Sequence, residues 1–451
     1  MEYNIILLIT CDALRADAVQ LINGSNTPNL NKLAKESIVF LNAFSNGPGT
    51  AQAFPAIMTS SYFLYHYGYN LNPKFRTLSE YLQQRGFVTI GFNTNPFLFG
   101  KFGYSRGFMK YFELFFQTKA IKEKRTLNRI RKILLEISPN KIKSAVFRKI
   151  KKIYWRLMRP EIPYLSADKL TNFVINCISN QKRKRLFMWV HYMDAHFPYA
   201  PPDEYLPEEF SSQLDALIFH YSLHRSFITK KDVIKLRKLY YGEVRFLDSQ
   251  IGRLINYLEE NNLKENSLII VTADHGDAFL EHGFLGHEFY NLYNEVLRVP
   301  LIIYDGRNSG KINQPVFLID ILPTILSYLK IKHSRTIKGM DLKVYYENHQ
   351  SEHIHRIAYA DSAMLRRDTQ RFDLNKPIIS VINYPWKMIY NSVKNTYELY
   401  NIAKDPHERK NIIDSETDIA DFLRRKLSEH ILEAKLYRIL RKLKRKKLKV
   451  H

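Results

Sequence analysis

Carboxylate and imidazole side chains stand directly after two strand-like segments of this 451-residue chain. The apolar run Ser267–Ala273 leads into Asp274-His275-Gly276, and the run Ile5–Thr10 leads through a cysteine to Asp12. The carboxyl ends of parallel strands share one sheet edge, where ligands collect, so these groups are expected to meet. Asp and His together are good ligands for a divalent cation. A capping role for Asp12, or for Asp277 in a polar turn, is the alternative, and the pairing of the two segments favours a metal site.

A candidate nucleophile follows a glycine- and proline-containing loop. Residues 45–49 lead to Thr50, which precedes a helix-like segment. Helix N-termini favour anions, and a hydroxyl beside a divalent metal can ionise and attack an ester. Two further imidazoles, His282 and His287, lie in one loop after Asp274. Considered alone, Thr50 could instead have the ordinary role of capping the helix that follows it.

The segments that position these residues alternate between strand and helix. This is the βαβ pattern of a largely parallel sheet with helices on its faces, and it predicts an α/β fold. The predicted strands are Ile5–Thr10, Ile38–Phe44, Val88–Phe92, Leu186–His191 and Ser267–Ala273, and the predicted helices are Thr27–Glu36, Leu78–Arg85 and Tyr240–Leu258.

Seven motifs occur in the order and spacing of the sulfatase family, which the chain resembles from about residue 4 to residue 412. That family belongs to the alkaline phosphatase superfamily. The resemblance implies a central, mostly parallel sheet flanked by helices, with a smaller C-terminal α+β subdomain. The motifs are Asp12-Ala-Leu-Arg15-Ala-Asp17, Thr50 with Thr59-Ser60, His191-Tyr-Met-Asp194-Ala-His196-Phe-Pro, Asp274-His275-Gly276, Glu295-Val-Leu-Arg298-Val-Pro300, Asp320-Ile-Leu-Pro323-Thr324 and Glu398 to Glu408.

The resemblance also implies roles for the histidines. His196 matches a family histidine that binds the ester or protonates its leaving group, and His287 stands where relatives carry a basic residue that contacts the substrate. His191 and Asp194 are expected to contact the substrate or to orient His196.

Four further residues receive expected roles from their places in the motifs. Asn95 lies in the region that often carries a Lys-x-His pair, and with Arg15 it is expected to contact the substrate. Arg298 is expected to support the scaffold, and Asp320 to cap the helix that follows it.

The chain departs from the family at the nucleophile. Classical sulfatases convert Cys or Ser in a Cys/Ser-x-Pro-x-Arg motif to formylglycine, whereas this chain has Thr50, Gln52 and Phe54 there. Thr cannot give that aldehyde, because its methyl group would leave a ketone. Superfamily members with an unmodified Thr nucleophile act on phosphoesters, some by transfer to an alcohol. The first motif also supplies one Asp, preceded by Cys11, where many sulfatases have two.

These residues predict a metal-dependent hydrolase of sulfate or related anionic esters. Asp12, Asp274 and His275 would hold one divalent cation (Ca, Mg, Mn or Zn), with Thr50 as nucleophile and fourth ligand. A binuclear site would need more ligands, from Asp194, His196 and His287. The alternatives are a phosphodiester or phosphonate hydrolase, a phosphoryl transferase acting on a glycan or lipid, and an inactive scaffold.

Charge and composition bear on partners and organisation. The formal charge of +24 favours an anionic ester, glycan or lipid surface, and no nucleic-acid motif accompanies it. A catalytic domain is expected over 1–345, with a basic helical insertion at about 105–165, most clearly Lys119–Arg159. A C-terminal subdomain is expected over 346–415, and a basic surface-docking helical tail over 416–451. The two cysteines leave the redox compartment open. No run reaches membrane-spanning length and the N-terminus enters its first strand without a leader-like pattern, so a cytoplasmic location is expected, with peripheral contact to anionic membrane through the basic helices.

Overall fold

A computed structural model describes residues 3–19, 26–115, 144–181, 185–223, 228–334, 336–347, 355–366 and 368–447 of the chain. Within these ranges, none of the helices combines the length and the apolar character that a membrane-crossing segment needs. Both Cys11 and Cys177 are free thiols.

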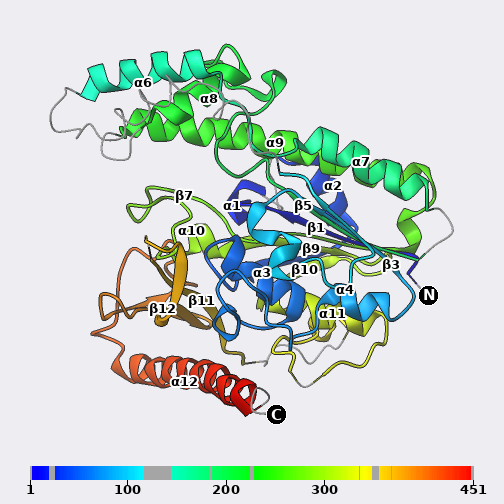
Figure 1. The fold of residues 1–451 in the computed structure, drawn as a ribbon, viewed down its shortest axis with the longest axis vertical. Coiled ribbons are helices and arrows are strands. Elements are labelled where there is room, and N and C mark those ends of the chain that lie inside the picture. Colours follow the sequence, from blue (N-terminus) through cyan, green and yellow to red (C-terminus); the bar gives the residue numbers. More distant parts are fainter. Residues whose placement is uncertain are drawn as a thin grey trace.

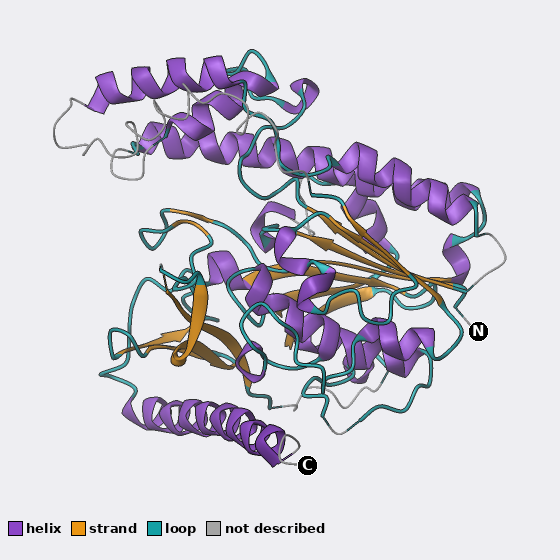
Figure 2. Ribbon diagram, in the orientation of Figure 1, coloured by secondary structure: helices purple, strands orange, loops and turns teal. Residues whose placement is uncertain are grey.

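An eight-stranded sheet forms the centre of the larger part of the molecule (Figures 1 and 2). Its strand order is β10-β2-β9-β6-β1-β5-β3-β4, and neighbouring strands are parallel except where β9 runs against β2 and β6. All five predicted strands are present. The strands are β1 (Ile5–Cys11), β2 (Ile38–Phe44), β3 (Val88–Asn93), β4 (Lys110–Glu113), β5 (Leu186–Tyr192), β6 (Ser267–Ala273), β9 (Arg298–Tyr304) and β10 (Gly310–Phe317).

The register of the three central strands places the predicted ligands. In β1, Ile5 pairs with Leu186 of β5 and with Ser267 of β6, and all three strands are seven residues long and fully buried. They are apolar along most of their length because both faces of the sheet are covered. The residues that follow them, including Asp12 and Asp274, therefore emerge side by side at one edge.

Helices cover both faces of this sheet. In Figure 1, α1, α2, α7 and α9 lie above it, and α3, α4 and α11 lie below it. The bounds are α1 (Ala16–Val19), α2 (Pro28–Lys35), α3 (Thr50–Thr59), α4 (Leu78–Gln83), α7 (Ala167–Ser179), α9 (Lys230–Glu260), α10 (Asn294–Leu297) and α11 (Ile321–Tyr328). The helices predicted around residues 27–36, 78–85 and 240–258 are confirmed.

A helical arm extends from the upper edge of Figure 1, where α6 (Ser144–Met158) and α8 (Gln213–Ser222) pack beside the start of α9. The expected basic insertion began too early. Because β4 pairs with β3, residues 110–113 belong to the central sheet. The predicted helical segment over 119–143 lies outside the described residues, whereas its continuation over 144–158 is α6.

A second, smaller unit follows, as expected. Its antiparallel sheet consists of β11 (Ala358–Arg366), β12 (Arg371–Asn383), β13 (Trp386–Asn391) and β14 (Thr396–Asn401). The final helix, α12 (Thr417–Lys447), packs on this unit through Ala420, Leu423 and Leu427, which are buried. The prediction of a surface-docking tail is therefore wrong for this part of α12, because its apolar side chains belong to a core.

The two predicted scaffold residues behave differently. Arg298 donates to the carbonyl oxygen of Leu41 at 2.8 Å and so ties β9 to β2, which agrees with a scaffold role. Asp320 does not cap α11 with its side chain. Its carboxylate accepts hydrogen bonds from the backbone N–H groups of Phe317 and Met340 and pairs with Arg356. These three donors occupy the carboxylate, so it is not directed at the first turn of α11.

A buried ion pair lies within the smaller unit. Lys387 Nζ lies 2.7 Å from Glu408 Oε1, and both side chains are inaccessible to solvent. Replacing Lys387 with Met is expected to lower the free energy of unfolding by about 3 kcal/mol, because it leaves the Glu408 carboxylate buried without its cation. Urea unfolding at neutral pH measures this. The double variant Lys387→Met/Glu408→Gln should regain most of the lost free energy of unfolding. Equal losses in the single and the double variant would contradict the expectation.

Candidate active site

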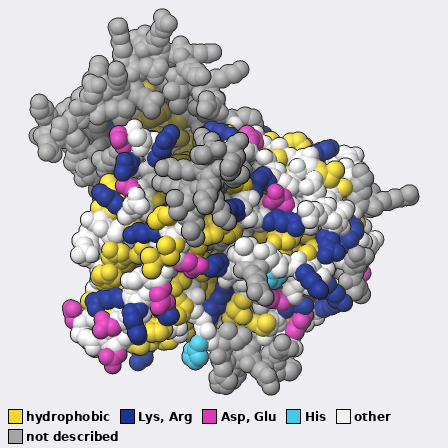
Figure 3. Space-filling view, turned by 60° about the horizontal axis from the view of Figure 1, so that its bottom comes forward, with side chains coloured by type: hydrophobic (Ala, Val, Ile, Leu, Met, Phe, Trp, Pro, Cys, Tyr) yellow, Lys and Arg dark blue, Asp and Glu magenta, His cyan; other side chains and the backbone are white. Residues whose placement is uncertain are grey.

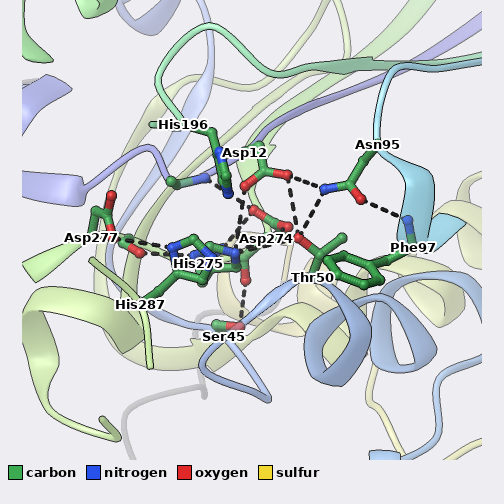
Figure 4. A network of polar contacts seen from close by, with 12 residues as sticks. Asp12, Ser45, Thr50, Asn95, Phe97, His196, Asp274, His275, Asp277 and His287 are labelled. Carbon is green, nitrogen blue, oxygen red and sulfur yellow. Dashed lines mark hydrogen bonds and ion pairs between the residues drawn. The ribbon is translucent and has the colours of Figure 1, made fainter. Parts of the chain in front are cut away.

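Polar side chains converge at the carboxyl edge of the central sheet (Figure 4). Asp12 follows β1, Asp274 and His275 follow β6, and Thr50 opens α3. One ligand atom from each of Asp12, Asp274 and His275 lies within 4.8 Å of the others, and all three residues are buried. The structure therefore brings the three predicted metal ligands together.

The carboxylate of Asp12 has one satisfied and one bare oxygen. Its Oδ2 lies near three donors: Asn95 Nδ2 at 2.7 Å, His191 Nε2 at 3.2 Å and Thr50 Oγ1 at 3.2 Å. Its Oδ1 is buried without a hydrogen-bond partner among the described residues. The donors fix the orientation of the carboxylate and leave Oδ1 facing the other two ligands.

Asp274 has the same asymmetry. Its Oδ1 accepts hydrogen bonds from its neighbour, the His275 N–H, at 2.9 Å and from the Ala13 N–H at 3.3 Å. Ala13 adopts a left-handed φ of 58°, which an alanine rarely takes, so the backbone turn after Asp12 is strained where it reaches Asp274. The other oxygen, Oδ2, is buried and has no hydrogen-bond partner in the described part of the chain.

The tautomer of His275 completes the set. Its Nδ1 lies 2.8 Å from the carbonyl oxygen of Gly276, which only accepts, so Nδ1 carries the proton. Burial and the neighbouring His287 lower the pKa of His275 to about 3, so the ring is neutral and Nε2 offers a lone pair. Nε2 lies 3.5 Å from both Asp12 Oδ1 and Asp274 Oδ2. Three buried electron-pair donors therefore face one another.

The electrostatics of the two carboxylates fit a bound cation. Burial and the charge of Asp12 raise the pKa of Asp274 well above its ordinary value. Burial acts in the same direction on Asp12, but His196, His191 and His275 together lower its pKa. Two carboxylates and a neutral imidazole form a mixed oxygen and nitrogen donor set that suits a divalent ion, whose charge would remove the repulsion between the carboxylates.

The hydroxyl of Thr50, the predicted nucleophile, lies beside the predicted metal ligands. Its Oγ1 donates to Asp12 Oδ2, accepts from Asn95 Nδ2 at 3.2 Å and lies 3.5 Å from His275 Nε2. Asn95 is held in turn, because its Oδ1 accepts the N–H of Phe97 at 2.9 Å. Thr50 does not cap α3, since Gly49 occupies the cap position in extended conformation. Its hydroxyl therefore serves the site and not the helix end.

A carboxylate orients the histidine on the open side. His287 Nδ1 lies 3.1 Å from Asp277 Oδ1, and Asp277 also accepts a hydrogen bond from the Tyr199 hydroxyl. Burial lowers the pKa of His287, but the bond and charge of Asp277 outweigh it and raise that pKa. The His287 ring centroid lies 4.2 Å from that of His275, so its Nε2 side borders the metal site.

His196 lies beside this pair. Its ring centroid is 4.9 Å from that of His287, and its Nδ1 lies 2.6 Å from the carbonyl oxygen of Phe197, which leaves Nε2 available. Phe197 stacks on His196 and is exposed, so it forms part of the mouth of the site. Both predicted catalytic histidines are therefore at the site.

Three predicted substrate contacts lie elsewhere. His191 is fully buried and binds Asp12, so it orients a predicted metal ligand and not His196. The Asp194 carboxylate is buried and accepts the Ala167 N–H at 2.9 Å, and burial raises its pKa to about 7. Arg15 pairs with Asp17 and Glu281 and donates to the Asp277 carbonyl at 2.7 Å, which supports the loop behind the site.

The sequence interpretation assigned no role at the site to Asp277, Tyr199 or Ser45. Asp277 was expected at most to cap a helix, but it precedes the short strand β7 (Ala278–Phe279), which pairs with β8 (Leu285–Gly286). That hairpin returns the chain so that His287 faces Asp277. Ser45 donates to the Asp274 carbonyl and holds the turn from behind. The closeness of Asp277 and His287 in sequence was the one available signal.

Glycine is required at Gly276 for close packing. A Cβ atom there would lie 2.3 Å from the Glu295 carbonyl oxygen, and the Gly276 N–H donates to the Val296 carbonyl at 2.7 Å. This contact fixes the turn that carries Asp274 and His275 against α10.

Comparison with protein families gives two matches. The family model Sulfatase matches residues 4–331, and the model described as N-sulphoglucosamine sulphohydrolase, C-terminal, matches residues 280–435. The second match runs into α12, in agreement with the packing of that helix on the smaller unit.

Individual relatives are distant. An arylsulfatase of Clostridium perfringens is 26% identical over 291 residues, which are 58% of this chain and only 57% of that protein. A phosphonate monoester hydrolase of Agrobacterium radiobacter has a similar structure, with a TM-score of 0.71, 20% identity and coverage of 96% of both chains. BT4656, solved with its substrate D-glucosamine-2-N,6-O-disulfate, gives a TM-score of 0.69 at 18% identity and covers 97% of this chain and 98% of its own.

Proposed function

Because this chain belongs to the sulfatase family of the alkaline phosphatase superfamily, we propose that it is a metal-dependent hydrolase of sulfate or related anionic esters. The observation that carries the proposal is the ligand geometry. The three residues concerned are Asp12, Asp274 and His275. In each of them one polar side-chain atom makes hydrogen bonds within the protein, and the other polar atom faces a buried point that all three share. Calcium, magnesium, manganese or zinc, bound there as a single ion, would polarise the ester and favour ionisation of a neighbouring hydroxyl.

Thr50 is the proposed nucleophile and fourth ligand. When the hydroxyl ionises, its proton passes along its hydrogen bond to Asp12 Oδ2 and from there to solvent. Oγ1 then forms a bond to the sulfur or phosphorus, and the bond from that atom to the ester oxygen breaks. The electron pair leaves with the ester oxygen. Water or an acceptor alcohol then attacks the Thr50 ester, which releases the acid or transfers it and restores the hydroxyl. Asn95 Nδ2 is the proposed donor to the ester anion.

His287 and His196 are the proposed acids and anion contacts. Asp277 holds His287 through Nδ1, so Nε2–H is left to donate to the ester or to protonate the leaving oxygen. His196 presents Nε2 beside it. Asp277 acts through His287 and is a positioning residue.

A phosphorus ester is the second candidate substrate, on a specific observation. At the position where classical relatives carry the arginine of the formylglycine motif, Phe54 packs its ring edge against His191, 5.0 Å between centroids. Neither Thr50 nor this apolar neighbour supports an aldehyde. A hydroxyl nucleophile suits phosphodiesters, phosphonates and phosphoryl transfer.

The substrate is proposed to be glycan- or lipid-linked. Support comes from BT4656, which was solved with a sulfated glucosamine, and from the net charge of +24, which favours anionic partners. Peripheral contact with an anionic membrane and a cytoplasmic location stay predictions.

The test compares turnover of an aryl sulfate, an aryl phosphate, an aryl phosphonate monoester and a diester, with each of the four cations supplied separately. We expect turnover of at least one ester, dependent on added metal and lost in chelator. If only a phosphorus ester is turned over, the protein is a phosphoester or phosphonate hydrolase, which is the second candidate. Failure to bind any of the cations would contradict the proposal and favour an inactive scaffold.

A further inference from the structure

Helix α6 has two chemically different faces. Its inner face is anchored to the arm: Trp155 stacks on Tyr221 of α8 with 4.8 Å between centroids, and Lys151 Nζ donates to the Leu223 carbonyl at 2.9 Å. Arg148 pairs with Asp232 of α9 at 3.1 Å, and Tyr154 is buried. The helix is therefore held in one rotational setting, and its outer face is not free to turn inward.

The outer face carries an exposed apolar stripe with basic side chains along one side of it. Ile150, Ile153 and Leu157, spaced by three and four residues, are 38%, 63% and 59% exposed. Lys149, Lys152 and Arg156 are exposed beside them, and the helix sequence contains no acidic residue. We call these six residues the outer face of α6. Three aliphatic side chains in water are unfavourable unless another apolar phase covers them.

Helix α12 offers a useful contrast. It also exposes an apolar stripe, Leu432, Leu436 and Ile439. Glu429 and Glu433 lie on the same stretch, in ion pairs with Lys426 and Lys338. Figure 3 likewise shows acidic and basic side chains intermixed on the molecular face that it draws. Of these two stripes, the one on α6 lies on a helix without acidic residues, whereas the one on α12 lies beside two glutamates.

We propose that the outer face of α6 binds the surface of an anionic lipid bilayer. Basic side chains along one side of an aliphatic stripe allow the stripe to enter the acyl boundary while the ammonium and guanidinium groups reach the lipid phosphates. A nucleic-acid backbone would engage the cations but leave the three aliphatic side chains in water.

The arm also connects this face to the mouth of the proposed active site. Next to Tyr221, which stacks on α6, His220 of α8 stacks on Phe197, with 6.0 Å between centroids and 5° between planes. Phe197 in turn stacks on His196. A bilayer bound at α6 thus lies a few side chains from the site. This part of the inference, which rests on the proposed function, assigns anionic esters in or attached to lipids as the substrate class.

The test is sedimentation of the full-length protein with vesicles of phosphatidylcholine containing phosphatidylglycerol, and with phosphatidylcholine alone. We expect binding to the anionic vesicles only. Ile153→Gln/Leu157→Gln and Lys149→Glu/Lys152→Glu should each weaken the partition at least about tenfold, since both the stripe and the cations contribute. Matched controls are Met109→Gln/Val393→Gln and Lys404→Glu/Lys410→Glu, which change exposed residues of the same types away from the helix.

Binding is measured without turnover, so its outcome is independent of the catalytic proposal. Equal binding of wild type and both α6 variants would overturn the inference, as would loss of binding in Leu432→Gln/Leu436→Gln instead. If the protein binds a random DNA duplex, and if this binding depends on the lysines but not on Ile153 and Leu157, the outer face of α6 is a nucleic-acid site instead.

The substrate class needs a separate test, in which an ester that the enzyme hydrolyses is coupled to an acyl chain. The α6 variants should lose turnover of the vesicle-bound form only, and equal loss on the soluble form would contradict that part.

Discussion

Replacing Asp274 with Asn is expected to abolish both cation binding and ester turnover while the fold is retained. The substitution keeps the size of the side chain, but it removes the charge that faces Asp12 Oδ1 and His275 Nε2. Loss of an outer-shell partner costs up to about 100-fold in metal affinity, so loss of a direct ligand should exceed that value. Calorimetric titration with the preferred cation and the turnover assay measure the two effects.

The matched control for this experiment is Asp361→Asn. Asp361 is also a buried aspartate, and its Oδ1 lies 2.8 Å from His430 Nε2, in the smaller unit and away from the site. This variant should bind the cation with unchanged affinity. Wild-type turnover by Asp274→Asn would show that the cation, if bound, is held elsewhere, and the ligand assignment would have to be withdrawn.

Replacing Thr50 with Val is expected to lower turnover by at least about 10³-fold, as loss of a nucleophile does in other hydrolases. Valine preserves the branched shape at the start of α3 but has no hydroxyl to attack the ester. Thr50→Ser should retain measurable turnover because it keeps the oxygen. Rapid quenching and mass spectrometry of the wild-type protein should find a sulfuryl or phosphoryl group on the peptide that contains Thr50.

Thr59→Val provides the control for Thr50→Val. Thr59 is a buried threonine at the other end of α3, where its hydroxyl donates to the Pro55 carbonyl, so its loss should leave turnover near wild type. Turnover that survives in Thr50→Val would mean that another group attacks the ester. Cation binding measured in the same variant separates a missing nucleophile from a damaged metal site.

Much of the site could be predicted because the ends of buried strands can be recognised in an amino-acid sequence. The runs that became β1 and β6 are apolar, and each is followed by a residue of a type that binds metals. The parallel register then places Asp12 and Asp274 together without any further information. The same reasoning found Thr50, since a tight loop before a helix leads the chain back to that edge.

Other features depend on contacts between distant segments. Asp277 is one residue from a glycine and would suit a helix cap, but the β7–β8 hairpin carries His287 back to it, and no local pattern indicates that return. Arg15 follows Asp12 closely, but Asp17 and Glu281 draw its guanidinium away. For α12, the basic composition suggested a surface tail, whereas Ala420, Leu423 and Leu427 find the apolar face of the smaller sheet.

The proposed nucleophile and the proposed cation ligands are carried by different kinds of element. Asp12, Asp274 and His275 follow strands of the core, whereas Thr50 belongs to a helix that reaches the site through a loop. Exchange of the residue at position 50 therefore leaves the strand register and the ion-holding geometry in place. A cation held by the strand-end residues would thus face whichever group position 50 carries, so a change of nucleophile requires substitution near one helix end and no change in the core strands.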